Sequence, residues 1–482
     1  MHMLRQPPQT HAGGEDLELP LHTNSVEAVS LEDRVQRIWD TCAKRNISVQ
    51  VVEQPLTRFI IAQRQLNGYR PHAYCDHFTT EWTTQDEEQL LRDGLLRELN
   101  PSAQHGQTVR GFSATEKQRT RRRAITHTPD FNLQNPAPHT ILDHNSPENA
   151  RELFTFKFAT TVDFRAYYHQ FGLDKQGQFV INGASGRSYH LTTIPTGATL
   201  SVDLASSYTD CLKAILLRCA PFRLLVHTYN DNVRIAADTS EELRQTIHLL
   251  FGLCQDLAIS VNESLTDVLH SDFIEHTFLG VVFNMTNRST TIAEKSAQRL
   301  RALTHNGILK VEHSTTIRHI LQIFGLVNFA VCHLHTNRAR WYHLLKFLRR
   351  RTGRHLDGAA NLWAHLTTAL PLWIAEILNA PPYVYPQDNA GETLTFSDAC
   401  PDGLGGVLVH PSGDFNIIAR PTTEAEKRLP INTLETIAAR WVLEHVPQGT
   451  SPIKMFIDNT SAIALTKGRV PRGFTAAKIA ED

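Results

Sequence analysis

The chain has 482 residues, which is long enough for roughly two to four domains with hydrophobic cores. Hydrophobic residues make up 41% and charged residues 20%, as in soluble globular proteins, and the net charge of −1 excludes a uniformly basic nucleic-acid-binding surface. No apolar run approaches membrane-spanning length, no secretory signal precedes residue 30, and the seven cysteines form no CxxC pair. We therefore expect an intracellular protein without a membrane span, with nucleus or cytoplasm left open.

The first hundred residues carry no chemistry that we can name. Residues 1 to about 30 lack periodicity and are predicted to be disordered. Residues 31–74 favour a helix followed by a strand pair, and residues 85–99 favour an amphipathic helix that Pro101 and Gly106 end.

Two carboxylates follow strand-like runs in the central part of the chain. Asp231 lies at the tip of a predicted hairpin, between an apolar run over 222–226 and an alternating run over 233–237. Asp163 ends a strand-like run that starts at Phe158. The separation, 231 − 163 = 68 residues, leaves room for a helix-containing connection that brings the two strands side by side.

Further elements are predicted around this pair. Residues 179–191 form two short strands around a glycine turn, residues 241–251 form a helix, and residues 296–378 are largely helical. Two basic clusters stand out, and each taken alone is most simply a solvated face. They are residues 117–123 and residues 338–354, of which the second interleaves its cations with Trp341, Tyr342 and Phe347.

A second acidic group follows a Pro- and Gly-rich linker over 380–391. Asp398 ends a strand and precedes a glycine turn, Glu435 lies on a helix, and Asp458 ends an apolar strand. Their spacings are 435 − 398 = 37 and 458 − 435 = 23 residues. Acids at the ends of two strands and on one helix can converge on metal ions.

These motifs resemble those of retroelement reverse transcriptases. Asp163 with Tyr168-His-Gln170 is similar to motif A, Ile194–Gly197 to the LPxG of motif B, and Tyr229–Asn232 to the YxDD box with an amide in place of the last acid. Phe278-Leu-Gly280 is similar to the primer-grip FLG. The later acids resemble the TDAS, NxxExxA and DNxxA motifs of ribonuclease H.

The resemblance implies an α+β and α/β multidomain fold, a right-hand polymerase of palm, fingers and thumb followed by a ribonuclease H-like domain. The expected domains are an N-terminal extension, partly disordered, over 1–80; reverse transcriptase fingers and palm over 81–285; thumb and connection helices over 286–385; and a C-terminally truncated ribonuclease H-like domain over 386–482.

For the polymerase, the resemblance implies that Asp163 and Asp231 bind two Mg²⁺ ions, with Mn²⁺ as a substitute. Asn232 keeps an oxygen donor but loses a negative charge. Tyr168 would exclude ribonucleotides, and Gly197 would lie in the substrate-binding segment of motif B.

A basic segment similar to KxRxxxDxRxLN would grip the nucleotide triphosphate. If Asp130 holds the place of the family's acid, the two arginines fall on Thr126 and Asn132, so a nearby cation must serve. Arg123 is the first candidate, with Lys117 and Arg122 behind it.

Residues 257–264 resemble the LGLxVNxxKS segment of the family, motif D, but Leu265 stands where its lysine, the family's candidate general acid, is expected. His270 or His276 could take the place of this lysine, but no feature of the sequence favours either of them.

For the nuclease, the resemblance implies that Asp398, Glu435 and Asp458 bind two Mg²⁺ ions and act on RNA in an RNA–DNA hybrid. The family's fourth acid belongs to a further helix, and Asp482 is a poor replacement for it.

The implied partners are an RNA template, a DNA primer, an RNA–DNA hybrid and dNTPs. The domain order resembles the central part of a retrotransposon polyprotein from an LTR, DIRS or VIPER-like element; the DIRS and VIPER-like types use a tyrosine recombinase, and a pararetroviral origin is an alternative. Because of Asn232 and Leu265, an alternative hypothesis stays open: the chain is a degenerate or host-adopted copy that binds nucleic acid or protein without catalysis. A nuclease-only protein ranks last.

Overall fold

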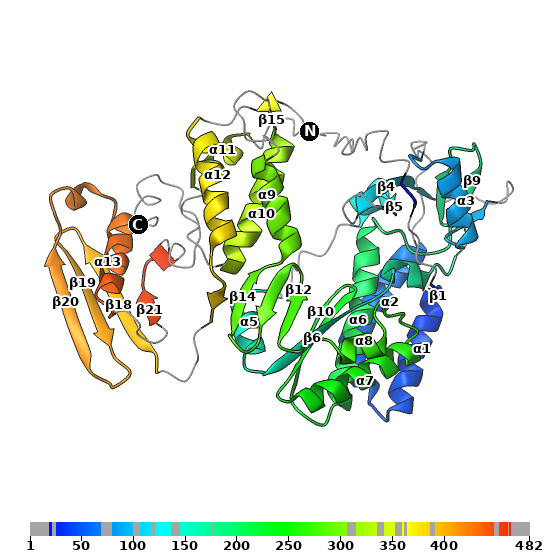
Figure 1. Cartoon of the computed structure of the whole chain (residues 1–482), viewed down its shortest axis with the longest axis horizontal. Helices are drawn as coiled ribbons and strands as arrows, with labels where there is room; N and C mark the ends of the chain where they lie inside the picture. Colours follow the sequence, from blue (N-terminus) through cyan, green and yellow to red (C-terminus); the bar gives the residue numbers. More distant parts are fainter. Residues whose placement is uncertain are drawn as a thin grey trace. The chain divides into compact units, whose positions relative to one another are not determined.

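The computed structural model divides the chain into two compact units (Figure 1). The first comprises Met1–His144 and Glu148–His276, and the second comprises Asn145–Pro147 and Thr277–Asp482. The structure describes residues 19–21, 26–68, 80–99, 107–116, 121–135, 145–175, 177–305, 315–334, 342–351, 359–360, 364–385, 391–447, 453–460 and 462–463.

A three-stranded sheet of order β10-β11-β6 lies at the centre of the first unit. Its strands are β6 (Phe158–Asp163), β10 (Leu224–Tyr229) and β11 (Asn232–Ala237). The predicted hairpin over 222–237 is confirmed, because β10 and β11 pair antiparallel with Tyr229 opposite Asn232. The core of this unit also contains α6 (Thr199–Cys219) and α7 (Ser240–Asp256), and α7 begins at a capping box made by Thr239 and Glu242.

The N-terminal segment belongs to the same core. The predicted helix is α1 (Leu31–Lys44), but the predicted strand pair is wrong, because residues 53–68 form helix α2 (Glu53–Gly68). Leu56, Phe59 and Leu66 recur at helical spacing and are buried in the core that α6 also builds.

The predicted disorder of residues 1–30 falls mostly outside the described residues. Where the segment is described the prediction is wrong, because Leu21 forms a parallel bridge with Arg122. Strand β1 (Val29–Ser30) also pairs with β7 (Phe171–Gly172).

A second sheet of order β2-β9-β8-β3 and a ribbon β4-β5 complete the first unit. The predicted helix over 85–99 is too long: α3 (Thr84–Arg92) ends before Gly94, whose φ of +71° favours glycine. Residues 96–98 then form a strand, so tertiary pairing overrides the leucine pattern. The strands are β2 (Leu96–Glu98), β3 (Gln107–Thr108), β4 (Arg110–Glu116), β5 (Arg121–His127), β8 (Phe179–Asn182) and β9 (Ser188–Leu191).

In the second unit, four helices build one hydrophobic core. They are α9 (Glu294–His305), α10 (Ile317–Leu334), α11 (Tyr342–Arg351) and α12 (Ala364–Asn379). A sheet of order β12-β13-β14-β17 accompanies them, with strands β12 (Glu275–Phe278), β13 (Val281–Asn284), β14 (Ser289–Ile292) and β17 (Tyr383–Val384).

Among the described residues, helix α10 is long and apolar enough to cross a membrane. No run of that length and composition was expected from the sequence. One face of α10 is buried in the core of this unit through Ile320, Ile323 and Val327. A core helix passes the same test of length and composition, so the finding is weak evidence for a membrane span.

The last sheet has the order β20-β19-β18-β21 and packs against α13 (Ile431–Glu444). Gly406 allows this packing, since a Cβ there would lie 2.2 Å from Val442 Cγ2. The strands are β18 (Thr393–Cys400), β19 (Gly403–Val409), β20 (Phe415–Pro421) and β21 (Ile453–Ile457). The remaining short α-helices and strands are α4 (Pro129–Gln134), α5 (Pro147–Leu153), α8 (Leu265–Leu269), β15 (Thr315–Thr316) and β16 (Ala359–Ala360). Short 3-10 helices form at Val49–Val52, Tyr167–Gln170 and Glu426–Arg428.

Candidate active sites

The turn between β10 and β11 carries Asp231. The pairing of Tyr229 with Asn232 leaves Asn230 and Asp231 as a two-residue turn, and Asn230 has a φ of 51°. Helix α6 holds this turn: Ser206 Oγ donates to Asn230 Oδ1 at 2.6 Å, and Thr209 Oγ1 donates to the Asn230 carbonyl oxygen at 2.7 Å. Asp231 is therefore presented on a fixed backbone.

Asp163 is the last residue of β6 and lies directly opposite Asn232 of β11. Phe164 N donates to the Asp231 carbonyl oxygen at 2.8 Å, so the chain after β6 is tied to the turn. Asn232 Nδ2 donates to Asp231 Oδ1 at 3.0 Å. The fold therefore brings Asp163, Asp231 and Asn232 together at one end of the sheet.

Burial raises the pKa of both acids, and like charge adds to this effect for Asp163. Burial, Asp231 and Glu263, in that order, raise the pKa of Asp163 to about 7, against the opposing effect of Arg123. Burial also raises the pKa of Asp231, although its hydrogen bond from Asn232 and the charge of Arg123 lower it in part. Crowded carboxylates are a hard anionic donor set, so these residues fit a Mg²⁺ site.

Glu263 is a residue of this site that our sequence analysis missed. Its Oε2 accepts a hydrogen bond from Asp163 N at 3.1 Å, although the two residues are 100 positions apart. The available signal was an acid in the segment 257–264, directly after Asn262.

Two of the three consecutive arginines of β5 lie in different surroundings: Arg122 is buried, and Arg123 is exposed. Arg123 is exposed, and its charge acts on both Asp163 and Asp231. Arg122 is buried and binds Asp86 through two hydrogen bonds of 2.6 and 2.9 Å, so it is not available to a nucleotide. Lys117 lies outside the described residues.

Tyr168 and Gly197 are the other two residues that the resemblance assigns to substrate binding. Tyr168 is half-buried in a short 3-10 helix (Tyr167–Gln170), and burial, Asp231 and Tyr229 raise its pKa to about 12. Gly197 N donates to the Thr126 carbonyl oxygen at 2.7 Å, and a Cβ on Gly197 would lie 2.6 Å from that oxygen. Glycine is required there by the close approach of β5.

Leu265, at the position expected for a lysine, is the first residue of α8, whose N-cap is Ser264. Of the two histidines that could substitute, His276 is buried, and burial and Arg234 lower its pKa to about 3. It is therefore neutral at physiological pH and unsuited to donate a proton. His270 is exposed and its Nδ1 lies 2.7 Å from the Thr266 carbonyl oxygen.

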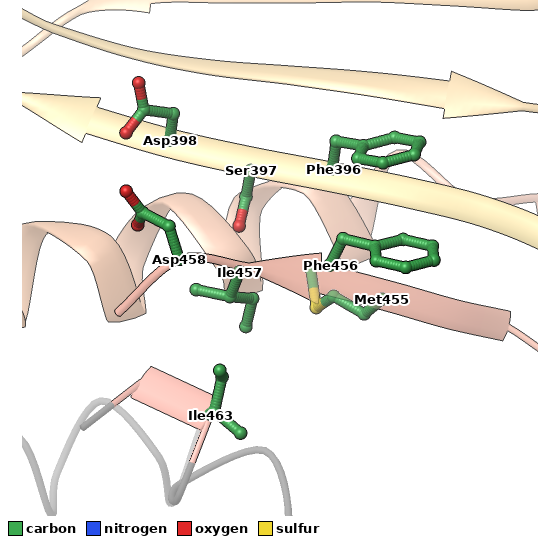
Figure 2. A pocket seen from close by; sticks show the side chains of 8 residues that line it. All are labelled: Phe396, Ser397, Asp398, Met455, Phe456, Ile457, Asp458 and Ile463. Carbon is green, nitrogen blue, oxygen red and sulfur yellow. The ribbon is translucent and has the colours of Figure 1, made fainter. Parts of the chain in front are cut away.

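The second acidic group lies in the second unit. Ligand oxygens of Asp398, Glu435 and Asp458 all lie within 4.8 Å of one another. Strands β18 and β21 pair in parallel with Ser397 opposite Ile457, so the aspartates that follow these two residues are neighbours. Figure 2 shows their carboxylates on the same side of the strands.

Glu435 is the buried member of this group. Burial, Asp458 and Asp398 raise its pKa, and its Oε2 is buried without a hydrogen-bond partner among the described residues. A buried carboxylate oxygen facing two exposed acids fits a divalent cation. The fourth acid that was expected beyond Asp458 falls outside the described residues, as does Asp482.

A pocket adjoins these acids and is lined by Phe396, Ser397, Asp398, Met455, Phe456, Ile457, Asp458 and Ile463 (Figure 2). The rings of Phe396 and Phe456 are stacked, with centroids 4.7 Å apart.

The basic cluster over 338–354 is described only within α11. Phe347 is fully buried in the core, so this ring does not lie on a solvated face with the cations of the cluster. Trp341 lies outside the described residues. Arg350 is exposed.

Comparisons with known proteins bear on the fold. A search of protein-family models finds no match, and a search of curated proteins finds none either. Among solved structures, the foamy viral protease-reverse transcriptase dRH in complex with ds DNA matches with a TM-score of 0.50 and 14% identity, over 96% of this chain and 81% of that one. The foamy viral protease-reverse transcriptase in complex with dsDNA matches with a TM-score of 0.49 and 15% identity, over 92% of each chain.

The chain has a reverse-transcriptase-like fold. The predicted fold class is confirmed: a mixed α/β multidomain protein in which a polymerase-like part is followed by a ribonuclease H-like part. At this level of identity the likeness concerns the fold alone.

Proposed function

We propose that the chain is an RNA-directed DNA polymerase with ribonuclease H activity. The observation that supports the polymerase is the convergence of Asp163 and Asp231 at one end of the β10-β11-β6 sheet in a reverse-transcriptase-like fold. The gathering of Asp398, Glu435 and Asp458 within 4.8 Å supports the nuclease.

In the polymerase, Asp163 and Asp231 would hold the divalent ions, two Mg²⁺ or Mn²⁺. When bound, these ions activate a primer hydroxyl and neutralise charge on a triphosphate. Arg123 would contact the triphosphate from β5, and Tyr168 would exclude ribonucleotides. Asn232 would orient Asp231 through its amide hydrogen bond.

In the nuclease, Asp398, Glu435 and Asp458 would hold two ions beside the pocket, and the substrate would be RNA in an RNA–DNA hybrid.

We further propose that the chain belongs to a retrotransposon polyprotein, with an element-encoded tyrosine recombinase as a candidate partner. Its motif order supports this origin.

Primer extension on an RNA template tests the polymerase, first with Mg²⁺ and then with Mn²⁺, which tolerates poorer ligand sets. We expect extension that disappears in Asp163→Asn and increases in Asn232→Asp. Cleavage of labelled RNA in a hybrid, with Asp398→Asn as the control, tests the nuclease.

A second function, binding of nucleic acid or protein without catalysis, is favoured by the neutral Asn232 and by Leu265 in place of a lysine. Intact hybrid binding with no extension and no cleavage by any version of the protein would establish it over the first.

A further inference from the structure

The segment Ser260–Glu263 runs beside the end of β6. Arg165 N donates to the Ser260 carbonyl oxygen at 2.9 Å, and Asn262 N donates to the Asp163 carbonyl oxygen at 2.8 Å. Phe164 and Val261 form an antiparallel bridge between these two bonds. Glu263 is therefore fixed beside Asp163 by backbone pairing, independently of its own side chain.

The Glu263 side chain contacts the backbone of Asp163. Its Oε2 accepts from Asp163 N at 3.1 Å, and its negative charge acts on the Asp163 carboxyl. The residue is half-buried, so its side chain stays within reach of solvent and ions.

The turn between β10 and β11 carries one carboxylate, Asp231, where the YxDD box has two. Asn232 lies opposite Asp163 and directs its Nδ2 to Asp231, so it adds a hydrogen bond and no negative charge. Strand β6 and the β10-β11 turn together supply two carboxylates, Asp163 and Asp231. Glu263 brings a third to the same end of the sheet from a different segment.

We propose that Glu263 is a third acidic residue of the polymerase site and supplies, toward the divalent cations, the negative charge that Asn232 lacks. This inference rests on the function proposed above for the same site. It predicts that the residues at 263 and 232 compensate for one another.

Manganese binding, measured by electron paramagnetic resonance, tests this without any need for catalysis. The full chain carries Asp398→Asn and Asp458→Asn, which silence the second acidic group. Against this background Glu263→Gln removes the charge, while the amide oxygen can still accept from Asp163 N. We expect its Mn²⁺ affinity to fall by roughly tenfold or more, as for loss of one charged contact.

Adding Asn232→Asp to Glu263→Gln is expected to restore most of the lost affinity. Glu241→Gln is the matched control, since it removes one exposed carboxylate from α7 and should leave Mn²⁺ binding unchanged. Asp163→Asn assigns the remaining ion signal to the polymerase site.

Unchanged Mn²⁺ affinity in Glu263→Gln would overturn the proposal, as would a failure of Asn232→Asp to rescue it. If Glu263→Gln does not fold, Asn232→Asp alone decides: a gain below about tenfold supports a third charge already present, and a larger gain contradicts it. Mn²⁺ binding without primer extension would refute the polymerase function and leave Glu263 as an ion-site residue. No Mn²⁺ binding by the parent chain would overturn both.

Discussion

At the residue scale, Asp163 combines burial with the repulsion of two other carboxylates. Because its pKa of about 7 in the folded chain exceeds its ordinary value of 3.8, folding favours the protonated form. The stability that this proton contributes is full below pH 4 and is lost as the pH rises through 7. A bound cation would offset that loss.

We therefore expect the wild type, without divalent ions, to lose more stability between pH 5 and pH 8 than Asp163→Asn does. Thermal unfolding of both proteins with a chelator measures the difference. Added Mg²⁺ should reduce the difference in stability between the two proteins at pH 8 and leave that difference unchanged at pH 5. Parallel pH profiles of the two proteins would contradict the assignment.

The neighbouring arginines of β5 give a second prediction at this scale. If Arg123 contacts the triphosphate, Arg123→Ala should raise the KM for dNTP by roughly 10- to 100-fold, the range for a charged hydrogen bond. Its melting temperature should stay near that of the wild type because the side chain is exposed. Steady-state primer extension gives KM, and an unchanged KM would remove Arg123 from the binding site.

At the scale of elements, the pair Arg122–Asp86 joins β5 to α3. Both side chains are almost fully buried, with 3% and 4% exposed. Arg122 Nε also donates to the Leu19 carbonyl oxygen at 2.7 Å, which connects the N-terminal segment to the ribbon. This ion pair therefore sets the position from which Arg123 is presented.

Removing one member of a buried ion pair leaves the other charge uncompensated. We expect Arg122→Ala to lower the free energy of unfolding by about 3–5 kcal/mol. Urea denaturation measures it, and Arg123→Ala, an exposed change one residue away, should stay within about 0.5 kcal/mol. Equal effects of the two variants would mean that the pair does not hold the ribbon.

The contact between Gly197 and β5 is a second link between elements. Because a Cβ would lie 2.6 Å from the Thr126 carbonyl oxygen, we expect Gly197→Ala to destabilise the fold by roughly 1–3 kcal/mol. Gly325→Ala in α10 is a control, since a Cβ there would meet nothing within 4 Å and the residue is exposed. Denaturation curves that match the wild type for Gly197→Ala would show that β5 can move away.

At the scale of the whole molecule, the two acidic groups belong to separate compact units. We expect Asp163→Asn to abolish primer extension and leave hybrid cleavage, and Asp398→Asn to do the reverse. Both assays on each variant, with melting curves as the control for folding, check this. Loss of both activities from either change would mean that the sites depend on one another.

Much of the fold follows from patterns that are local in the sequence. The hairpin around Asp231 and the strand that ends at Asp163 depend on short alternating runs, and the structure contains both. The helix over 85–99 was predicted too long because a leucine pattern cannot register the pairing of β2 with β9. The strand pair after α1 was wrong for a similar reason, since α2 is stabilised by burial against the core.

The sequence by itself determined that Asp163 and Asp458 lie at strand ends and that Asp231 lies in a hairpin turn, because strand alternation and turn composition involve neighbouring residues. Asp398, also expected at a strand end, lies inside β18. Only the tertiary structure decided that Arg122 is buried against Asp86, that Phe347 is buried, and that Glu263 lies against Asp163. Each of these depends on backbone pairing or packing between segments far apart in the chain, as the 100 residues between Asp163 and Glu263 illustrate. No local pattern carries that information.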